Sequence, residues 1–279
     1  MKFFIWIFTQ KNRMQKSIIL FISFLSFSAF SQTTKDISNV TRYEYELSAK
    51  TSKKNLENIS TTVCALDILG DSSIFFDTAN YERKKIRKNP KKDLSPEEKG
   101  MLGLSFRPVF NWFVVSQGKE NRFYSDINED YKYFVVELKK DIEWVIDSKV
   151  NTWNTYSVQQ AKTTYGGREW TVLFTQDIPL HSGPYVFNNL PGMVVKAWDS
   201  EEHYVFELLS SKKAELDWKV LGLNDHIEND RKRIDKAIRL NNNKTYLQIF
   251  DEKGIKIGEN GRAGFNIKIG DGKNDIYIL

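Results

Sequence analysis

Short runs of alternating apolar and polar residues recur along the chain and predict β-strands. Such runs occupy residues 43–47, 123–127, 131–138 and 144–146. A nearly continuous apolar run follows at residues 170–174, and further strand-like runs lie at 185–187, 193–198 and 204–208. Turn residues separate these runs and no long helix lies between them, which favours an antiparallel sheet over a parallel α/β fold. We therefore expect a mainly β protein, with a curved antiparallel sheet or a partly open barrel or sandwich and one face in water.

One segment near the C-terminus has helical periodicity instead. In residues 224–240, Ile227, Ile234 and Ile238 fall near one face of a helix, and Asn224 is a candidate N-cap. We expect this C-terminal helix and few others.

Two further segments complete the expected domain. Residues 246–250 and 265–269 are expected as short strands between glycine-rich turns, so residues 224–279 form a C-terminal extension. Residues 83–99 are highly charged, contain two prolines and predict an exposed insertion. Its basic residues favour a solvated loop over contact with lipid headgroups or an acidic partner, because no aromatic residues are interleaved with them.

The N-terminal residues have the pattern of a secretory signal. Basic residues precede an apolar run at residues 18–30, and small residues precede a cleavage site near Ser31/Gln32. The run is short for a membrane span, which needs about 20 apolar residues, so a retained anchor is the less favoured alternative. We expect residues 1–31 to be a signal peptide and residues 32–279 to be a single exported domain, periplasmic or extracellular.

Removal of the signal changes the charge balance. The full chain has 41 Lys and Arg against 36 Asp and Glu, and residues 1–31 hold four of the basic residues and no acid. The remainder has 37 basic against 36 acidic residues, a net charge of +1, so binding to nucleic acid is not expected. Met14 is a more conventional start than Met1, which makes residues 1–13 a candidate upstream extension.

Residues for catalysis or metal binding are sparse. Cys64 is the single cysteine and lies in an apolar run, which favours a buried side chain over a reactive thiol. His181, Asp199 and His203 could meet at one corner, but no His-x-x-x-His or Cys-x-x-Cys pair supports a metal site. Ser182 beside His181 is the one suggestive nucleophile pair, yet neighbours on a strand point to opposite faces. We expect no catalytic residue, no metal and no cofactor.

The strongest local pattern lies in residues 183–208. Gly183-Pro184 breaks one strand, and Leu190-Pro191-Gly192 predicts a type II turn with positive φ at the glycine. Asp199 opens a polar turn that favours solubility over acid–base chemistry.

A hairpin turn at Gly166-Gly167 precedes this segment, and Arg168 and Trp170 then share one face of the next strand. A stacking or cation–π contact is expected there. The candidate binding residues, an aromatic face at this corner, are Arg168, Trp170, Tyr185, Phe187 and Trp198. Exposure of these rings with Trp112 and Trp153 would favour a binding surface, whereas their burial would favour a structural protein.

The ordered combination of residues from Gly167 to Leu208 resembles the GLPGLI family, secreted proteins common in Bacteroidetes. The positions that match its pattern are Arg168, Trp170, Ile178, Pro179, Gly183, Pro184, Tyr185, Phe187, Leu190, Pro191, Gly192, Asp199, Tyr204 and Phe206. Asn189 replaces the first Gly of the name motif, and Met193-Val194 replaces Leu-Ile. Asn tolerates positive φ, so the turn is expected to survive.

The resemblance implies a secreted or periplasmic β-rich protein of a Gram-negative bacterium, without an established activity. Some relatives resemble the N-terminal domain attached to a bacterial peptide-N-glycosidase, which hints at contact with a glycan or glycoprotein. Three hypotheses follow. The chain is a cell-envelope binding or accessory protein for an envelope protein, peptide, glycan or lipid, a structural interaction protein, or an uncharacterised hydrolase.

Overall fold

The structure, a computed structural model, describes residues 37–88, 95, 98, 105–127, 132–252 and 254–273. The chain divides into two compact units, residues 1–38 and 39–279, and the elements below lie in the second apart from the start of the first strand. The predicted signal peptide, most of residues 89–104 and the last residues, 274–279, lie outside the described residues.

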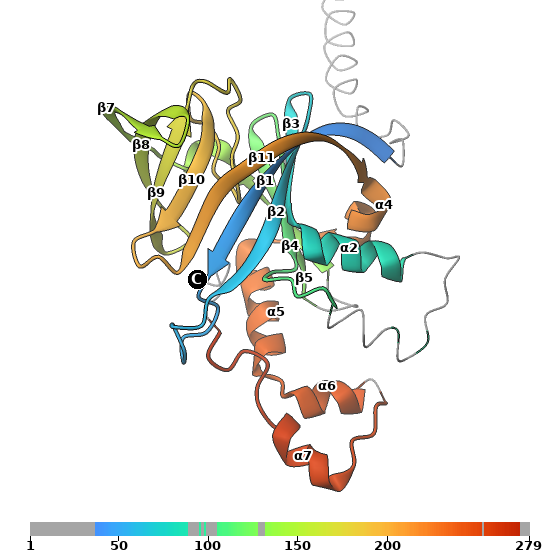
Figure 1. The fold of residues 1–279 in the computed structure, drawn as a ribbon. Helices are drawn as coiled ribbons and strands as arrows, with labels where there is room; N and C mark the ends of the chain where they lie inside the picture. Colours follow the sequence, from blue (N-terminus) through green and yellow to red (C-terminus); the bar gives the residue numbers. More distant parts are fainter. Residues whose placement is uncertain are drawn as a thin grey trace, which may run out of the picture. The chain divides into compact units, whose positions relative to one another are not determined.

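In the described residues, twelve strands form one open sheet, which Figure 1 shows bent along its length. The strands are β1 (Ile37–Ala49), β2 (Ser60–Leu69), β3 (Ser72–Asp77), β4 (Trp112–Gln117), β5 (Glu120–Asp126), β6 (Lys132–Leu138), β7 (Val145–Trp153), β8 (Tyr156–Tyr165), β9 (Arg168–Thr175), β10 (Met193–Asp199), β11 (Tyr204–Asp217) and β12 (Ile227–Glu228). Their order across the sheet is β12-β6-β5-β4-β3-β2-β1-β11-β10-β9-β8-β7. The successive pairs from β1 to β6 and from β11 to β7 are antiparallel, and β12 joins β6 in parallel. The prediction of a mainly β, antiparallel fold is confirmed.

The helices are short, and all except α2 follow β11 in sequence. They are α2 (Thr78–Arg87), α4 (Trp218–Leu221), α5 (Arg231–Asn243), α6 (Tyr246–Glu252) and α7 (Glu259–Phe265), with 3-10 turns η2 (Lys139–Asp141) and η3 (Leu223–Asp225). Within the described residues, no helix is long and apolar enough to cross a membrane.

The predicted C-terminal helix is present but begins later than expected. Residues 224–240 were expected to be helical from Asn224, whereas α5 starts at Arg231 and its N-cap is Asp230, which accepts a hydrogen bond from the Arg233 N–H at 2.9 Å. Ile227 instead pairs with β6 in β12. The helical prediction holds for Ile234 and Ile238, which are buried.

The two short strands predicted after this helix are wrong. Residues 246–250 lie in α6, and Phe265 ends α7. The Phe250 and Phe265 rings pack against each other with centroids 5.2 Å apart, so apolar residues expected to line a strand hold two helical segments together.

The central strands are buried on both faces of the sheet. Successive side chains of a strand point to opposite faces. Phe75 of β3 and Trp112 of β4 therefore belong to one core, whereas Phe76 and Phe113 belong to another. The expectation of one wet face is wrong for these strands.

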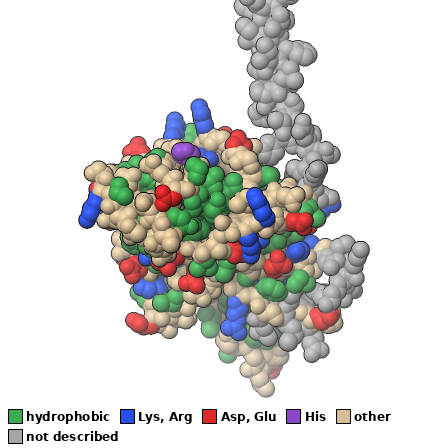
Figure 2. All heavy atoms as spheres, turned by 45° about the horizontal axis from the view of Figure 1, so that its top comes forward, with side chains coloured by type: hydrophobic (Ala, Val, Ile, Leu, Met, Phe, Trp, Pro, Cys, Tyr) green, Lys and Arg blue, Asp and Glu red, His purple; other side chains and the backbone are tan. Residues whose placement is uncertain are grey.

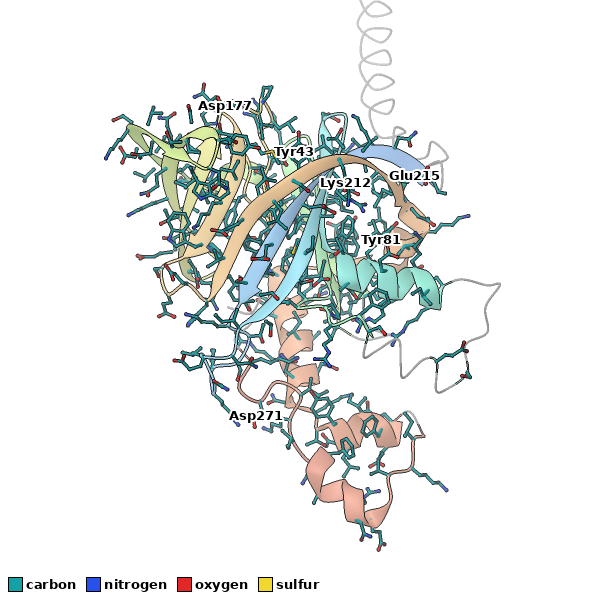
Figure 3. The ribbon with its side chains drawn as sticks, in the orientation of Figure 1. Tyr43, Tyr81, Asp177, Lys212, Glu215 and Asp271 are labelled. Atoms are coloured by element: carbon teal, nitrogen blue, oxygen red, sulfur yellow. The ribbon has the colours of Figure 1, made fainter. Side chains whose placement is uncertain are left out.

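Helices α2 and α4 cover the second core and lie together in Figure 1. Tyr81 of α2 packs on Phe76 with ring centroids 5.0 Å apart, and its hydroxyl accepts a hydrogen bond from the Asp217 N–H at 2.8 Å (Figure 3). The predicted exposed loop at residues 83–99 is therefore wrong for its first part, because Arg83–Arg87 belong to α2.

The Asp77 carboxylate fixes the start of α2. It is 1% exposed and accepts hydrogen bonds from the Asn80 N–H at 3.1 Å and the Val109 N–H at 2.8 Å. The Thr62 hydroxyl donates a third at 3.3 Å. Burial raises the pKa of Asp77, against the effect of these backbone donors. One side chain thus caps the helix and anchors the segment that leads into β4.

Replacement of Asp77 should test this anchor. Asp77→Ala leaves buried N–H groups without an acceptor, so we expect the free energy of unfolding to fall by about 2 to 4 kcal/mol. Urea denaturation of the variant and of Asp71→Ala, which removes an exposed carboxylate in the β2–β3 turn, gives the comparison. An equal and small loss in both variants would contradict the anchoring role.

Candidate functional site

The aromatic residues predicted to form a binding face are mostly part of the core. Trp170 is 1% exposed, Tyr185 is 3% exposed and Phe187 is fully buried. The Trp170 and Phe187 ring centroids are 4.9 Å apart, and those of Tyr185 and Phe187 are 5.5 Å apart. These three residues hold the fold together and do not present an open face.

The remaining aromatic candidates do not complete such a face. Trp198 is half-buried, and the Lys196 ammonium lies 5.5 Å from its ring centroid. Trp112 is 3% exposed and Trp153 is half-buried against the main core. Exposed rings would have favoured a binding surface. Because most of these rings are buried, the idea of an aromatic binding face is weakened and a structural role is favoured.

The segment at residues 185–187 is a buried turn, not the predicted strand. Tyr185 has φ 58°, and the Phe187 N–H donates to the Pro184 carbonyl at 3.1 Å. A Cβ added at Gly183 would lie 2.6 Å from the Val194 Cβ, so only glycine lets this turn press against β10.

The Leu190-Pro191-Gly192 segment is also not the predicted type II turn. Gly192 has no positive φ, whereas Asn189 has φ 67°. A Cβ added at Gly192 would lie 2.1 Å from the Thr175 carbonyl oxygen. Glycine is therefore required at position 192 because there is no space for a side chain beside β9. The positive φ lies at Asn189 instead, a residue type that tolerates it, as expected from the sequence.

A methyl group at position 192 should disrupt this corner. We expect Gly192→Ala to lower the free energy of unfolding by about 3 kcal/mol, because the backbone of β9 must move to accept it. Gly264→Ala in α7 is the matched control, since its Cβ would enter open space. Similar melting temperatures for the two variants would show that the close approach is not a constraint.

Arg168 and Asp199 form an ion pair at the end of the same corner. The Asp199 side chain is 2% exposed and also accepts a hydrogen bond from the Tyr204 N–H at 2.9 Å. The Arg168 guanidinium lies over the Tyr204 ring, 5.1 Å from its centroid. The expected cation–π contact is present, with Tyr204 in place of Trp170. The interpretation of Asp199 as a solubilising residue is wrong, because its carboxylate is buried and holds the turn.

His203 adds a proton-dependent contact to this pair. Its Nδ1 lies 3.4 Å from Arg168 Nη1 and 3.0 Å from Glu201 Oε2. This nitrogen accepts from Arg168 when it carries no proton and donates to Glu201 when it carries one. Together with Gly166 and Gly167, which both have positive φ as a tight hairpin requires, these residues line an open groove of 570 Å³.

A larger cavity of 920 Å³ has Tyr204 in its lining. We call it the basic cavity, and its described lining is Thr51, Asn58, Ile59, Ser60, Thr61, Arg83, Arg107, Pro108, Val109, Phe110, Asn111, Trp112, Tyr204, Tyr246 and Lys273. Every charged side chain among these residues is a cation. Within the described part of the chain, no ion pair neutralises Arg83, Arg107 or Lys273.

The cationic walls come from three separate parts of the chain. Arg83 is on α2, where burial lowers its pKa and the nearby Arg87 lowers it further. Arg107 lies in the segment that Asp77 anchors, and Lys273 forms a bridge with Ser52 after β1. The Lys54–Asp271 ion pair, 2.6 Å long, holds the C-terminal segment at this place, where Figure 3 labels Asp271.

Sequence reasoning missed this cavity. Arg83 was assigned to a solvated loop, and nothing in the spacing of Arg107 or Lys273 links them to it. The one available signal was the run of basic residues that begins at Arg83. On the face shown in Figure 2, positive and negative side chains are interspersed around a group of hydrophobic ones.

One polar atom at the cavity has no partner. The Trp112 indole N–H is buried and finds no acceptor, although its ring stacks on Phe110 with centroids 3.8 Å apart. Trp112 also lines a neighbouring 80 Å³ space between β5 and α5. An unsatisfied buried donor costs about 1 to 3 kcal/mol, so a ligand oxygen that reached it would be favoured.

The histidines do not assemble a catalytic or metal centre. His181 Nδ1 bonds the Leu190 carbonyl at 2.6 Å, while Ser182 bonds Ser73 at 3.1 Å. His226 is buried between the Asp126 carboxylate and the Gly222 carbonyl. No group of three His, Cys, Asp or Glu side chains in the described ranges is placed to hold a metal ion.

Cys64 and Asp126 are two further titratable side chains that lie in the interior of the protein. The prediction that Cys64 is buried is confirmed, and burial raises the pKa of its thiol well above the usual range. Although burial opposes it, His226 and Lys84 hold the pKa of Asp126 below its ordinary value. Both features stabilise or seal the core and provide no open reactive group.

Comparison with known proteins supports the fold. No family model and no curated protein matches the chain. Two crystal structures of PNGF-II, in space groups C2 and P21, are similar to it with TM-scores of 0.51 and 0.52 and 17% identity. Each match covers 75% of this chain and 34% or 35% of the PNGF-II chain, so the chain spans about a third of the length of PNGF-II. At this identity the likeness concerns the fold alone.

Proposed function

We propose that the protein is an exported member of the GLPGLI family that serves as a binding or accessory protein of the bacterial cell envelope. Its binding site is the basic cavity, and its partner is an envelope protein, peptide or glycan. Of the motif residues, Tyr204 lines this cavity, and the others form the packed corner beside it.

The motif geometry supports the family part of the proposal. Gly183 and Gly192 stand where no other residue fits, and Arg168 and Asp199 form a buried pair. Proteins that share a fold but bind different partners are expected to share the residues that packing requires. The motif positions are of this kind. The match to about a third of the longer PNGF-II chains supports an accessory role, because the same fold there is part of a larger protein.

The basic cavity is the observation that carries the proposal for binding. Its volume of 920 Å³ is that of a small-ligand site. Its described lining has cations, amides, hydroxyls and rings, but neither a nucleophile beside a base nor a pair of carboxylates. Such a lining is suited to retain a ligand and lacks the groups that acid–base or nucleophilic hydrolysis uses.

A second function, as a structural interaction protein, is favoured by the edge of the sheet. Among the described strands, β7 has a neighbour on one side only, and its Val145 and Val150 are 76% and 63% exposed. An edge strand with exposed apolar residues can pair with a strand of another protein.

Export is tested by the N-terminus of the protein recovered from cells. We expect the periplasmic or extracellular fraction to contain a chain that begins near Gln32, because the signal is cleaved there. N-terminal sequencing of that fraction gives the answer. A cytoplasmic protein that retains residues 1–31 would overturn the export proposal.

The partner is tested by capture from solubilised envelope. Trp170 and Tyr185 are buried, so their removal would report unfolding. We expect Arg107→Gln/Lys273→Gln to lose most captured material, because both side chains are exposed cations of the basic cavity. The control is Lys85→Gln/Lys232→Gln, which removes the same charge from exposed positions outside the cavity.

The same capture separates the two functions. Val145→Lys/Val150→Lys charges the free edge of β7 and leaves the cavity intact. Loss of captured material in this variant alone would favour the structural function. Identical captured material in all the variants would remove both.

A further inference from the structure

The lining of the basic cavity points to a particular class of ligand. We propose that the cavity binds an acidic saccharide, in which sugar hydroxyls and at least one carboxylate contact different parts of the wall. This inference rests on the proposed binding function and names its ligand.

The cations select for negative charge. Arg83, Arg107 and Lys273 approach one space from α2, the segment before β4 and the C-terminal segment, and no carboxylate lines it among the described residues. A guanidinium presents two parallel N–H donors that match a carboxylate. An anion in the cavity therefore gains contacts that compensate for its loss of water, whereas a cation would be repelled.

The neutral polar residues select for hydroxyl groups. Asn58 and Asn111 supply amides, and Thr51, Ser60 and Thr61 supply hydroxyls along the same wall. Each of these groups can both donate and accept, as a sugar hydroxyl does. The Asn111 amide N–H already donates to the Asp126 carbonyl, and the Thr51 and Ser60 hydroxyls lie 3.5 Å apart, but their remaining donor and acceptor positions suit a ligand with several hydroxyl groups better than a small inorganic anion.

The rings select for the apolar face of a sugar. Tyr246 lines the cavity and is 45% exposed, which leaves its ring available for contact with ligand C–H groups. Trp112, whose buried N–H has no acceptor, also lines the cavity. Charge, hydroxyl partners and an open ring thus occur together within 920 Å³, room for a few sugar units.

Isothermal titration calorimetry of the purified protein tests the inference with defined probes. The acidic probes are trigalacturonate and 3′-sialyllactose, the matched neutral probes are carboxyl-reduced trigalacturonate and lactose, and the third probe is inorganic phosphate. We expect at least one acidic saccharide to bind about tenfold or more tightly than its neutral counterpart and than phosphate, and we expect added salt to weaken this binding.

Two variants locate the binding. Arg107→Gln/Lys273→Gln should weaken the acidic saccharide about tenfold, whereas Lys85→Gln/Lys232→Gln should leave it unchanged. Tyr246→Ala should weaken it about fivefold and leave phosphate binding unaffected. All substituted side chains are at least partly exposed, and unchanged melting temperatures show that the variants fold.

The outcomes are distinct. Equal affinity for an acidic saccharide and its neutral counterpart overturns the role of charge, and phosphate binding as tight as the saccharide overturns the saccharide class in favour of a simple anion. Absence of binding by both acidic saccharides overturns the inference. If envelope capture still depends on Arg107 and Lys273 in that case, the proposed binding function stands with another kind of partner.

Discussion

The two-sided burial of the central strands is the constraint on which the other features depend. Phe75 and Phe76 are neighbours in β3 and serve different cores, so each face of the sheet needs its own cover. Helices α2 and α4 cover one face, and the buried turn at residues 183–192 with its rings covers the other. The helix and the turn are therefore fixed by the same requirement, although they lie far apart in the sequence.

This arrangement explains why a motif rich in aromatic residues forms core and not a binding surface. The rings of Trp170, Tyr185 and Phe187 fill the space above one sheet face. Gly183 and Gly192 permit the chain to enter that space, and the Arg168–Asp199 pair closes its end. The binding proposal consequently rests on Arg83, Arg107 and Lys273, which lie outside the motif, although Tyr204 of the motif also lines the cavity.

The sequence predicted parts of β1, β5, β6, β9, β10 and β11, because each contains a local apolar pattern. It did not single out β2, β3, β4 or β8, and β3 and β4 lack alternation because both of their faces are buried. The hairpin at Gly166-Gly167 and the burial of Ile234 and Ile238 were also predictable from local patterns. Prediction from the sequence failed where a contact between residues far apart in the chain determines the local structure. Helix α2 forms in a highly charged segment because Asp77 caps it and Tyr81 reaches the sheet, and neither partner is visible in the local pattern.

The candidate site could not be predicted either, because it is formed by residues that lie far apart in the sequence. Arg83, Arg107 and Lys273 come together only after the C-terminal segment returns to the loop following β1. No short window of sequence contains two of them. The binding residues predicted from the sequence lie close together in the chain and form a strong pattern, but the pattern arises from packing in the core. They are Arg168, Trp170, Tyr185, Phe187 and Trp198.

The position of β1 in the sheet has a consequence for how the chain folds. Its neighbours are β2, which follows at once, and β11, which is made much later, and the Tyr45 hydroxyl of β1 donates to the Val194 carbonyl across 149 residues at 2.6 Å. During synthesis, one edge of β1 therefore stays unpaired until most of the domain has been made. Contacts of such high separation slow folding and leave apolar strand edges open to aggregation, so the chain gains from being kept unfolded until it is complete.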